Sequence, residues 1–287
     1  MLKPSILLQY LMPKQLITEL AGQYANKKAG KLTTRVIKWF VKRYKVNMSE
    51  AANPEIASYA TFNDFFTRPL NEAARPLAVA DFVCPVDGAI SQFGKIKINQ
   101  IFQAKNHSYS TLALVAGNVP LASHFENGQF ACLYLSPKDY HRIHMPCDAT
   151  LKTMAYVPGD LFSVNPTTAE NVPNLFARNE RAVCEFHSEI HGTFVMVLVG
   201  ATIVGSMATT WHGIVNPPRD KNVQHWSYIG QEITFKQGEE MGRFLLGSTV
   251  VMLFEKGKIT FNETWQPARL IKLGEEMGNI IDNKKPA

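Results

Sequence analysis

Hydrophobic residues beyond position 80 fall in short runs that glycine, proline and asparagine separate from one another. Clear runs of this kind lie at 130–135, 151–157, 182–186, 194–199 and 249–254. Runs of this length, rich in valine and aromatic residues, are typical of buried or half-buried β-strands joined by turns. The pattern therefore predicts a mainly antiparallel β core for this part of the chain.

The first fifty residues follow a helical period instead. Apolar residues over 6–12 end at Pro13, which breaks or starts a helix. Farther on, basic and apolar positions fall on opposite sides of a helix. The basic side holds Arg35, Lys38, Lys42 and Lys45, and the apolar side holds Val36, Ile37, Phe40, Val41 and Tyr44. We expect an α+β chain, with a helical region over 1–57 and a β core over 58–287.

Positive charge is concentrated in the predicted helical region. Residues 1–50 contain ten lysines and arginines against two glutamates, a net charge of +8, whereas the whole chain of 287 residues carries +6. A basic surface suits either nucleic acid or an anionic membrane. The charge lies on an apolar-faced helix and no nucleic-acid motif is visible, so the pattern suits a helix in the lipid interface better than nucleic-acid binding. The alternative, which the residues alone favour, is that the apolar side packs on the core while the cations face water.

No part of the sequence predicts a membrane span. The amino-terminal apolar run is too short to cross a bilayer, and it lacks the small-residue cleavage site of a secretory signal. The uncharged stretch 192–211 is interrupted by Gly200 and Gly205, so it predicts two adjoining buried strands. The four cysteines form no Cys-x-x-Cys pair, and we expect them to be reduced and buried.

Candidate chemistry begins with two motifs that are each ambiguous alone. Leu246 to Thr249 reads Leu-Gly-Ser-Thr, and a Gly-Ser pair is ordinarily typical of a turn or a strand irregularity. Asp87 precedes Gly88, and Asp-Gly is also a common turn sequence. Farther along, Glu239 and Glu240 are predicted to be solvated.

Two histidines supply a candidate base. His141 and His144 could bind zinc from one face of a helix, but Pro137 and Pro146 bracket the segment and favour a strand. On a strand the two side chains point to opposite faces. Because no third ligand lies nearby in the sequence, we expect no metal site. Either histidine could equally be a buried residue that backbone carbonyls satisfy.

Seven stretches extend the pattern along nearly the whole chain. They are residues 61–70, 85–88, 136–146, 156–165, 174–181, 199–206 and 241–254. In this order they resemble the bacterial type of phosphatidylserine decarboxylase. The Leu-Gly-Ser-Thr cleavage motif of that family is intact, and the catalytic stretches show no departure from it. The tail after Gly278 is shorter than in longer-tailed relatives.

The resemblance implies a proenzyme that cuts itself between Gly247 and Ser248. Ser248 attacks the carbonyl group of Gly247, His144 takes the serine proton, and Asp87 orients His144. Elimination then converts Ser248 into a pyruvoyl group, which is the covalent cofactor, and no metal is required. The products are a large chain of residues 1–247 and a small chain of residues 248–287.

The resemblance also implies the activity of a carboxy-lyase in phospholipid biosynthesis, which converts phosphatidylserine to phosphatidylethanolamine. The substrate amine condenses with the pyruvoyl ketone to a Schiff base that accepts electrons as carbon dioxide leaves. The expected proton donor is His144, freed from its first task, or else His141. Ser163 is expected to line the pocket.

The expected location is the cytoplasmic face of the bacterial inner membrane, as a peripheral protein. The expected partners are phosphatidylserine in an anionic membrane and the other chain of the same precursor, but not nucleic acid. A homodimer is left open. Two alternative functions remain: a self-cleaving serine hydrolase with the same triad but no pyruvoyl group, and a non-enzymatic basic membrane-binding protein.

Overall fold

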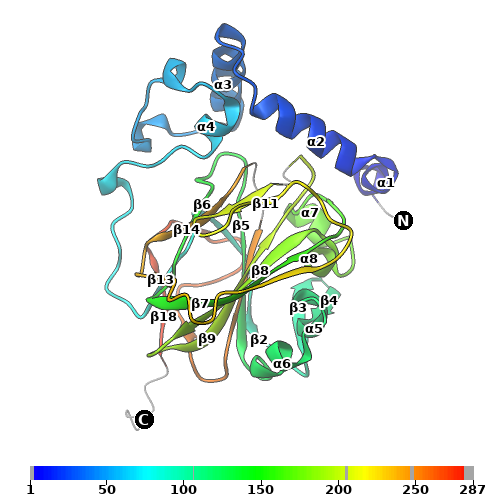
Figure 1. Cartoon of the computed structure of the whole chain (residues 1–287), viewed down its shortest axis with the longest axis vertical. Coiled ribbons are helices and arrows are strands. Elements are labelled where there is room, and N and C mark those ends of the chain that lie inside the picture. The colour runs from blue at the N-terminus through cyan, green and yellow to red at the C-terminus, as the bar shows by residue number, and fades with distance from the viewer. Residues whose placement is uncertain (1–2, 106, 204–205, 246–248, 281–287) are drawn as a thin grey trace.

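Helices α1 to α4 lie at one end of the molecule, and β-sheets together with the short helices α5 to α8 form the rest of it (Figure 1). The computed structural model describes residues 3–105, 107–203, 206–245 and 249–280. Within them the α-helices are α1 Pro4–Leu11, α2 Lys14–Ala25, α3 Lys31–Tyr44, α4 Phe62–Phe66, α5 Thr111–Leu114, α6 Val119–His124, α7 Pro166–Ala169 and α8 Leu175–Arg178. Three short 3₁₀ turns are η1 Met48–Glu50, η2 Ile56–Ser58 and η3 Glu72–Ala74.

The largest sheet is nine-stranded and antiparallel throughout its described pairings. In spatial order its strands are β12 Gln224–Ser227, β7 Ala149–Val157, β8 Arg181–Ser188, β9 Gly192–Val199, β15 Thr249–Phe254, β5 Gln129–Tyr134, β2 Gly88–Lys95 and β17 Leu270–Ile271. The ninth strand, β13 Thr234–Phe235, also pairs with β7. All five runs that the sequence predicted to be strands lie in this sheet, so the prediction of an antiparallel α+β fold is confirmed.

Smaller sheets complete the β core. A four-stranded sheet runs in the order β11 Gly213–Asn216, β10 Met207–Thr209, β14 Glu240–Phe244 and β6 Arg142–His144. The others are a three-stranded sheet of β1 Phe82–Val83, β18 Glu276–Asn279 and β16 Thr260–Phe261, and a hairpin of β3 Gln100–Ala104 and β4 His107–Ser110.

Strand alternation divides the core into two apolar layers on either side of the large sheet. In β15, Val250 and Met252 face the four-stranded and three-stranded sheets, whereas Val251 and Leu253 face the short helices α5 to α8. All six residues of β15 are buried, which explains why its sequence is continuously apolar and does not alternate with polar residues.

The short helices beyond residue 80 were not predicted. Helices α5 to α8 have only four to six residues each, which is too short to show a helical period in the sequence. Three of them begin at a side chain that accepts a backbone N–H bond, namely Ser110, Asn118 and Asn165. Such polar caps resemble ordinary turn residues when only the sequence is known.

The apolar side predicted for α3 divides into two parts. Ile37 packs with Phe65 and Phe66 of α4 in a small apolar cluster, which Phe40 also contacts. This half of the side follows the core-packing alternative. In contrast, Val36 remains exposed, as do Leu32 and Trp39 beside it. The cluster joins α3 to α4, so packing continues across residue 57, where the sequence predicted the end of the helical region.

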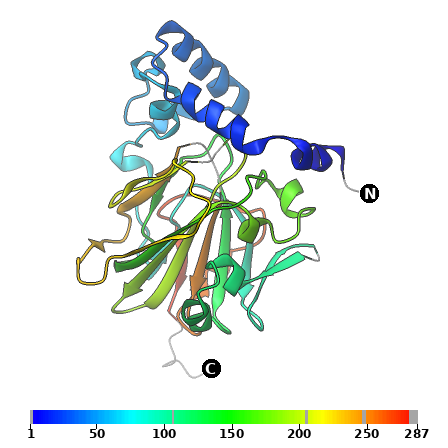
Figure 2. The ribbon, with the colours of Figure 1, turned by 45° about the vertical axis from the view of Figure 1, so that its right-hand side comes forward.

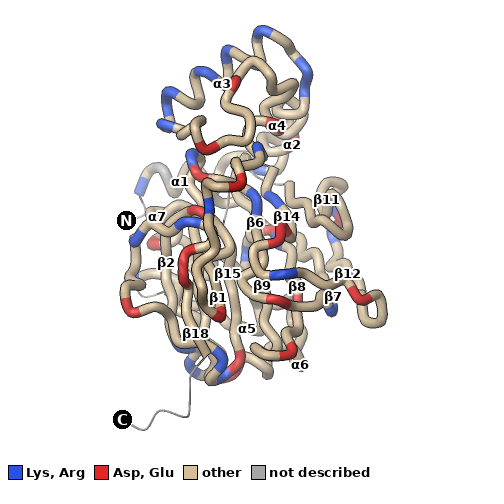
Figure 3. The backbone as a smooth tube through the Cα atoms, turned by 90° about the vertical axis from the view of Figure 1, so that its left-hand side faces the viewer, with Lys and Arg blue, Asp and Glu red and all other residues tan. Residues whose placement is uncertain are grey.

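Several lysine and arginine residues lie on α3 at the helical end of the molecule (Figure 3). The rotated view places α1, α2 and α3 across this end (Figure 2). Among the residues described, none of the helices has the length and apolar character needed to cross a membrane. All four cysteines are free and buried, as predicted.

Candidate functional site

Three strands of the large sheet bring Asp87 close to the end of the predicted cleavage motif. Tyr134, at the end of β5, pairs with Ala89 of β2 on one side and with Thr249 of β15 on the other. Asp87 lies two residues before Ala89, and the predicted cleavage motif ends at Thr249. Gly88 lies between Asp87 and Ala89, and glycine is required there because a side chain would collide with the carbonyl group of Tyr134.

The chain changes sheets at the predicted cleavage motif. Before it, β14 belongs to the four-stranded sheet, and the Leu245 N–H bonds the carbonyl oxygen of Ser206 at 3.0 Å. After it, Thr249 begins β15 at the centre of the large sheet. Gly247 and Ser248 themselves lie outside the described residues. The structure therefore fixes both ends of the motif and the groups that surround those ends.

Asp87 is buried and bound to Arg75. The Arg75 Nε and one terminal nitrogen donate to its carboxylate at 2.9 and 2.5 Å, and the Leu273 N–H donates at 2.9 Å. These bonds use most of the acceptor positions of one carboxylate. A bidentate arginine contact of this kind is among the strongest that a carboxylate makes in a protein.

Arg75 also connects the site to the helical end. The same terminal nitrogen lies 2.7 Å from Glu50 Oε2, in η1, and the Lys272 ammonium lies 3.6 Å from the other oxygen of Glu50. Arg75 is nearly inaccessible, with its side chain 7% exposed. Since a buried charge is costly without partners, Arg75 and Asp87 stabilise each other in place.

His144 is held by two other groups. Its Nδ1 lies 2.7 Å from the carbonyl oxygen of Gly238, and its Nε2 lies 3.1 Å from the hydroxyl of Tyr140. A carbonyl oxygen can only accept, so Nδ1 carries the proton and the neutral ring presents a lone pair at Nε2. Gly238 has a φ of 81°, and a side chain there would meet Leu77.

Asp87 and His144 are close neighbours without a direct hydrogen bond. The backbone N–H of His144 donates to the carbonyl oxygen of Pro85, two residues before Asp87. Both ring nitrogens of His144 and the carboxylate of Asp87 are nevertheless engaged by the groups named above. Asp87 therefore reaches His144 through its charge, which favours the protonated ring.

Burial lowers the pKa of His144 below its ordinary value of 6.5. The Gly238 carbonyl and the carboxylates of Glu240 and Asp87 act in the opposite direction, and the nearby Arg142 reinforces the effect of burial. The ring is consequently neutral at pH 7. A neutral imidazole, which carries no proton on its second ring nitrogen, is the form that a general base requires.

His141 is the more deeply buried of the two histidines. Its ring lies against Phe66, with centroids 4.1 Å apart, and burial lowers its pKa to about 3. Its Nδ1 donates to the carbonyl oxygen of Asp139 at 2.8 Å, whereas its Nε2 has no hydrogen-bond partner among the described residues. This nitrogen is therefore a buried hydrogen-bond acceptor without a donor among the described residues.

Ser163 lines an apolar cavity of about 550 Å³ between the helical end and the β core. The helices contribute Ala21, Tyr24, Lys27, Leu32, Val36, Trp39 and Phe40, among others. The β core contributes Tyr134, Leu135, Pro137, Ser163, Val164, Asn165, Ala201, Thr202 and Ile203. Because Tyr134 pairs with Thr249, the cavity adjoins the end of the predicted cleavage motif.

Helices α1 and α2 hold the loops that border this cavity. The Ser163 N–H donates to Gln9 Oε1 at 2.9 Å, and the Ile203 N–H donates to Thr18 Oγ1 at 3.0 Å. The ammonium group of Lys14 lies 4.0 Å from the centre of the Phe162 ring. The position of the amino-terminal helices is therefore coupled directly to the walls of the cavity.

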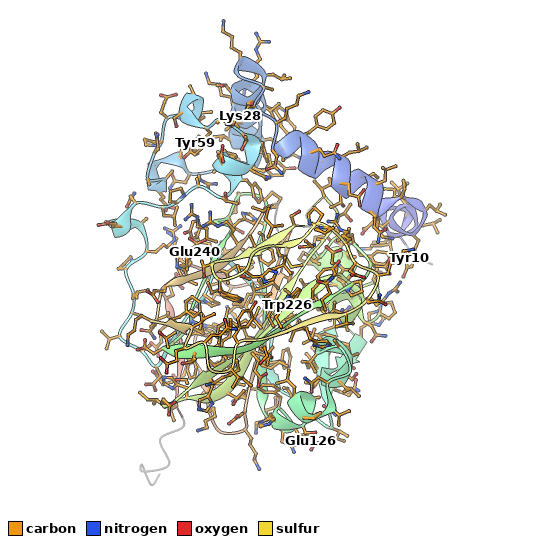
Figure 4. The ribbon with its side chains drawn as sticks, in the orientation of Figure 1. Tyr10, Lys28, Tyr59, Glu126, Trp226 and Glu240 are labelled. Carbon is orange, nitrogen blue, oxygen red and sulfur yellow. The ribbon has the colours of Figure 1, made fainter. Side chains whose placement is uncertain are left out.

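Glu240 differs from the prediction that it is solvated. It is the first residue of β14, and Figure 4 shows it in the β part of the molecule, below the label of Tyr59. Arg142 and Arg243 each approach one of its carboxylate oxygens, at 2.8 and 2.7 Å, and its side chain is only 18% exposed. The prediction failed because the pairing of β6 with β14 brings Arg142 beside it, and Arg243 lies three residues farther along β14.

No cluster of three or more histidine, cysteine or acidic side chains that could hold a metal ion occurs in the described ranges. Three contacts of the site were not predicted: Arg75 with Asp87, and Gly238 and Tyr140 with His144. The only sequence signal for Tyr140 is its place in the same short stretch as both histidines. Arg75 and Gly238 have no such signal.

Comparison with known proteins agrees with the resemblance seen in the sequence. A family model described as phosphatidylserine decarboxylase matches residues 62–279, and a second one described as PSD matches residues 4–45. A protein of Dechloromonas aromatica named phosphatidylserine decarboxylase proenzyme is 66% identical over 275 residues, which are 96% of this chain and 97% of that protein.

Two further relatives carry the same name. The protein of Albidiferax ferrireducens is 68% identical over 95% of this chain and 96% of its own length. That of Methylobacillus flagellatus is 65% identical over 95% of this chain and 98% of its own length. With one family model and near-full-length relatives in agreement, the chain belongs to the phosphatidylserine decarboxylase family.

Proposed function

We propose that this protein is a self-cleaving proenzyme that decarboxylates phosphatidylserine to phosphatidylethanolamine. The observation that carries the proposal is the identity of about two thirds, over nearly the whole chain, with proteins named phosphatidylserine decarboxylase proenzyme. The surroundings of the Leu-Gly-Ser-Thr motif support it. Thr249 pairs with Tyr134, which also pairs with the strand that follows Asp87, and the Phe244 N–H just before the motif donates to the carbonyl oxygen of His141.

Self-cleavage would begin with attack of the Ser248 hydroxyl on the carbonyl carbon of Gly247. His144 accepts the hydroxyl proton, and the amide becomes an ester as the Ser248 nitrogen is released. Loss of the Ser248 α-proton then eliminates residue 247 as a carboxylate, and hydrolysis of the product releases ammonia. The neutral state of His144 supports this role, since a protonated ring could not act as a base.

Asp87 would stabilise the protonated form of His144 that this step creates. In the described structure its carboxylate is ionically paired with Arg75 and raises the pKa of the nearby imidazole. The proposed triad of Asp87, His144 and Ser248 thus differs from a serine protease triad, in which the carboxylate accepts the Nδ1 proton directly. Here the Gly238 carbonyl fixes the tautomer, and Asp87 supplies charge.

The pyruvoyl group formed from Ser248 supplies a ketone that binds the substrate amine and accepts electrons as carbon dioxide leaves. Two buried polar atoms fit a polar group at this position. His141 Nε2 and Thr249 Oγ1 both lack hydrogen-bond partners in the part of the chain that the structure describes. Ser163 would contact the substrate from the wall of the neighbouring cavity.

A membrane-associating role for residues 1–57, with residues 58–287 as the catalytic core, follows from the surface of the helices. Leu11 of α1 is 75% exposed and Trp39 of α3 is 61% exposed. Along α3, basic residues such as Lys38 neighbour Trp39, which suits insertion into an anionic lipid interface. Helices α2 and α3 also line the apolar cavity, so a lipid substrate could pass from the bilayer to the site without entering water.

Decarboxylation is tested directly with phosphatidylserine labelled at the serine carboxyl group. The wild-type protein should release labelled carbon dioxide, and Ser248→Ala should release none, because the ketone cannot form. Reduction with cyanoborohydride during turnover should link the substrate amine to chain 248–287 and stop the reaction. Equal release by Ser248→Ala, or lipid ester hydrolysis in its place, would contradict the proposal.

Self-cleavage should depend on pH through His144. The neutral ring is the base and burial lowers its pKa, so the rate should stay constant around pH 7 and fall only as the pH drops through a value below 6.5. Glu240→Gln removes a charge that raises this pKa, so the midpoint should move lower still. The test is the cleavage rate of freshly translated precursor against pH.

Glu263→Gln is the matched control, because Glu263 is exposed and is not among the groups that shift the pKa of His144. It should leave the midpoint unchanged. A wild-type midpoint above 6.5 would exclude a buried, neutral His144 as the base.

Membrane binding should depend on the exposed apolar residues of the helices. Leu11→Glu and Trp39→Glu should each weaken sedimentation with phosphatidylglycerol vesicles by about tenfold or more. The reason is that burial of one large apolar side chain is worth roughly 1.5–3 kcal/mol. Ile190→Glu and Ile229→Glu are controls, since both side chains are about as exposed but lie on the β core. An equal loss in all four variants would contradict insertion of the helices.

A further inference from the structure

Helix α1 presents different sides to solvent and to the β core. Leu7, Leu8 and Leu11 are each more than half exposed. Ile6, by contrast, is 1% exposed and packs in the apolar layer that contains the short helices. Gln9 lies three residues after Ile6, so its side chain points to the same inward side of the helix. A polar side chain in that position requires hydrogen-bond partners in the β core.

Gln9 has two such partners, one on each end of its amide group. The Ser163 N–H donates to Gln9 Oε1 at 2.9 Å, and Gln9 Nε2 donates to Thr168 Oγ1 at 3.2 Å. Because a backbone N–H can only donate, the amide oxygen of Gln9 must face Ser163. Thr168 is fully buried, and Gln103 binds the carbonyl oxygen of the next residue, Ala169, at 2.7 Å. Gln9 therefore joins Ser163 to a rigid support in α7.

Asn165 closes these contacts into a ring of four side chains. Its Oδ1 accepts both the backbone N–H and the hydroxyl of Thr168, at 2.9 and 3.1 Å. Its Nδ2 donates to Ser163 Oγ at 2.9 Å. The ring thus runs from Ser163 through Gln9, Thr168 and Asn165 and returns to Ser163. Each hydrogen bond in it has one possible direction, because the backbone donors determine the orientation of both amides.

The ring leaves the hydroxyl hydrogen of Ser163 available to a ligand. Asn165 donates to the Ser163 oxygen, so the hydroxyl acts as an acceptor there and keeps its own hydrogen. No side chain or carbonyl oxygen in the described ranges accepts that hydrogen. Ser163 and Asn165 both line the apolar cavity of about 550 Å³. Ser163 is therefore oriented as a hydrogen-bond donor at the wall of this cavity.

We propose that Gln9 is a positioning residue for decarboxylation, which orients Ser163 so that its hydroxyl donates to an oxygen of the substrate headgroup. Gln9 acts through Ser163 and does not contact the substrate itself. Helix α1 consequently has two roles, because its exposed leucines face outward while its inward side fixes one wall of the substrate site. This inference rests on the proposed function, in which Ser163 contacts phosphatidylserine.

Gln9→Met removes both hydrogen bonds, keeps the length of the side chain and adds no charge. The KM for phosphatidylserine in mixed micelles should rise about tenfold with kcat unchanged, the effect of weakening one hydrogen bond to the bound substrate. Self-cleavage and vesicle binding should match the wild type, which shows that the variant is folded. Gln23→Met is the matched control, because Gln23 is exposed on α2 and should leave the KM unchanged.

A double-mutant cycle with Ser163→Ala tests whether Gln9 acts through Ser163. Ser163→Ala should raise the KM by a similar factor, and adding Gln9→Met to it should raise the KM no further. Two effects that multiply would show that Gln9 acts elsewhere and would overturn the inference. A wild-type KM in either single variant would overturn it too, while leaving decarboxylation itself intact. A wild-type protein that does not decarboxylate phosphatidylserine would overturn the proposed function and this inference together.

Discussion

The burial of β15 on both faces is the constraint on which the site depends. This strand is paired with β9 and β5 along its whole length, and its six side chains fill the apolar layers on either side of the large sheet. Thr249 is consequently fixed at the end of the large sheet where β5 ends and β2 begins. Since β14 belongs to another sheet, the Leu-Gly-Ser-Thr motif connects two rigid elements, and Asp87 precedes a strand close to the second of them.

The charged side chains around the motif are buried as ion pairs. Arg75 joins Asp87 to Glu50, and Glu240 lies between Arg142 and Arg243. Such pairs are maintained because each partner would be costly to bury alone. Burial meanwhile keeps both histidines neutral, although in different ways. The Nε2 atom of His144 is hydrogen-bonded to the Tyr140 hydroxyl, whereas the Nε2 atom of His141 has no hydrogen-bond partner among the described residues.

Much of the fold was readable from the sequence, and the contacts of the site were not. The strands were predicted because continuous apolar runs mark elements that are buried on two faces. Helices α5 to α8 were missed because they are too short to show a helical period in the sequence. The apolar side of α3 was predicted as one surface, but only half of it faces outward and the other half packs against α4. The family motifs indicated Asp87 and His144, but a partner such as the Gly238 carbonyl belongs to the backbone and has no signature in residue type. Arg75 pairs with Asp87 across twelve residues of sequence, a choice that only the fold determines.

Self-cleavage at Ser248 can be measured from the intact mass of the protein under denaturing conditions. We expect the wild-type protein to consist of chains 1–247 and 248–287, with the small chain blocked by a carbonyl group at its first residue. Ser248→Ala should remain a single chain. A wild-type chain that stays uncut with anionic lipid present, or a small chain that begins with a free serine amine, would contradict the account.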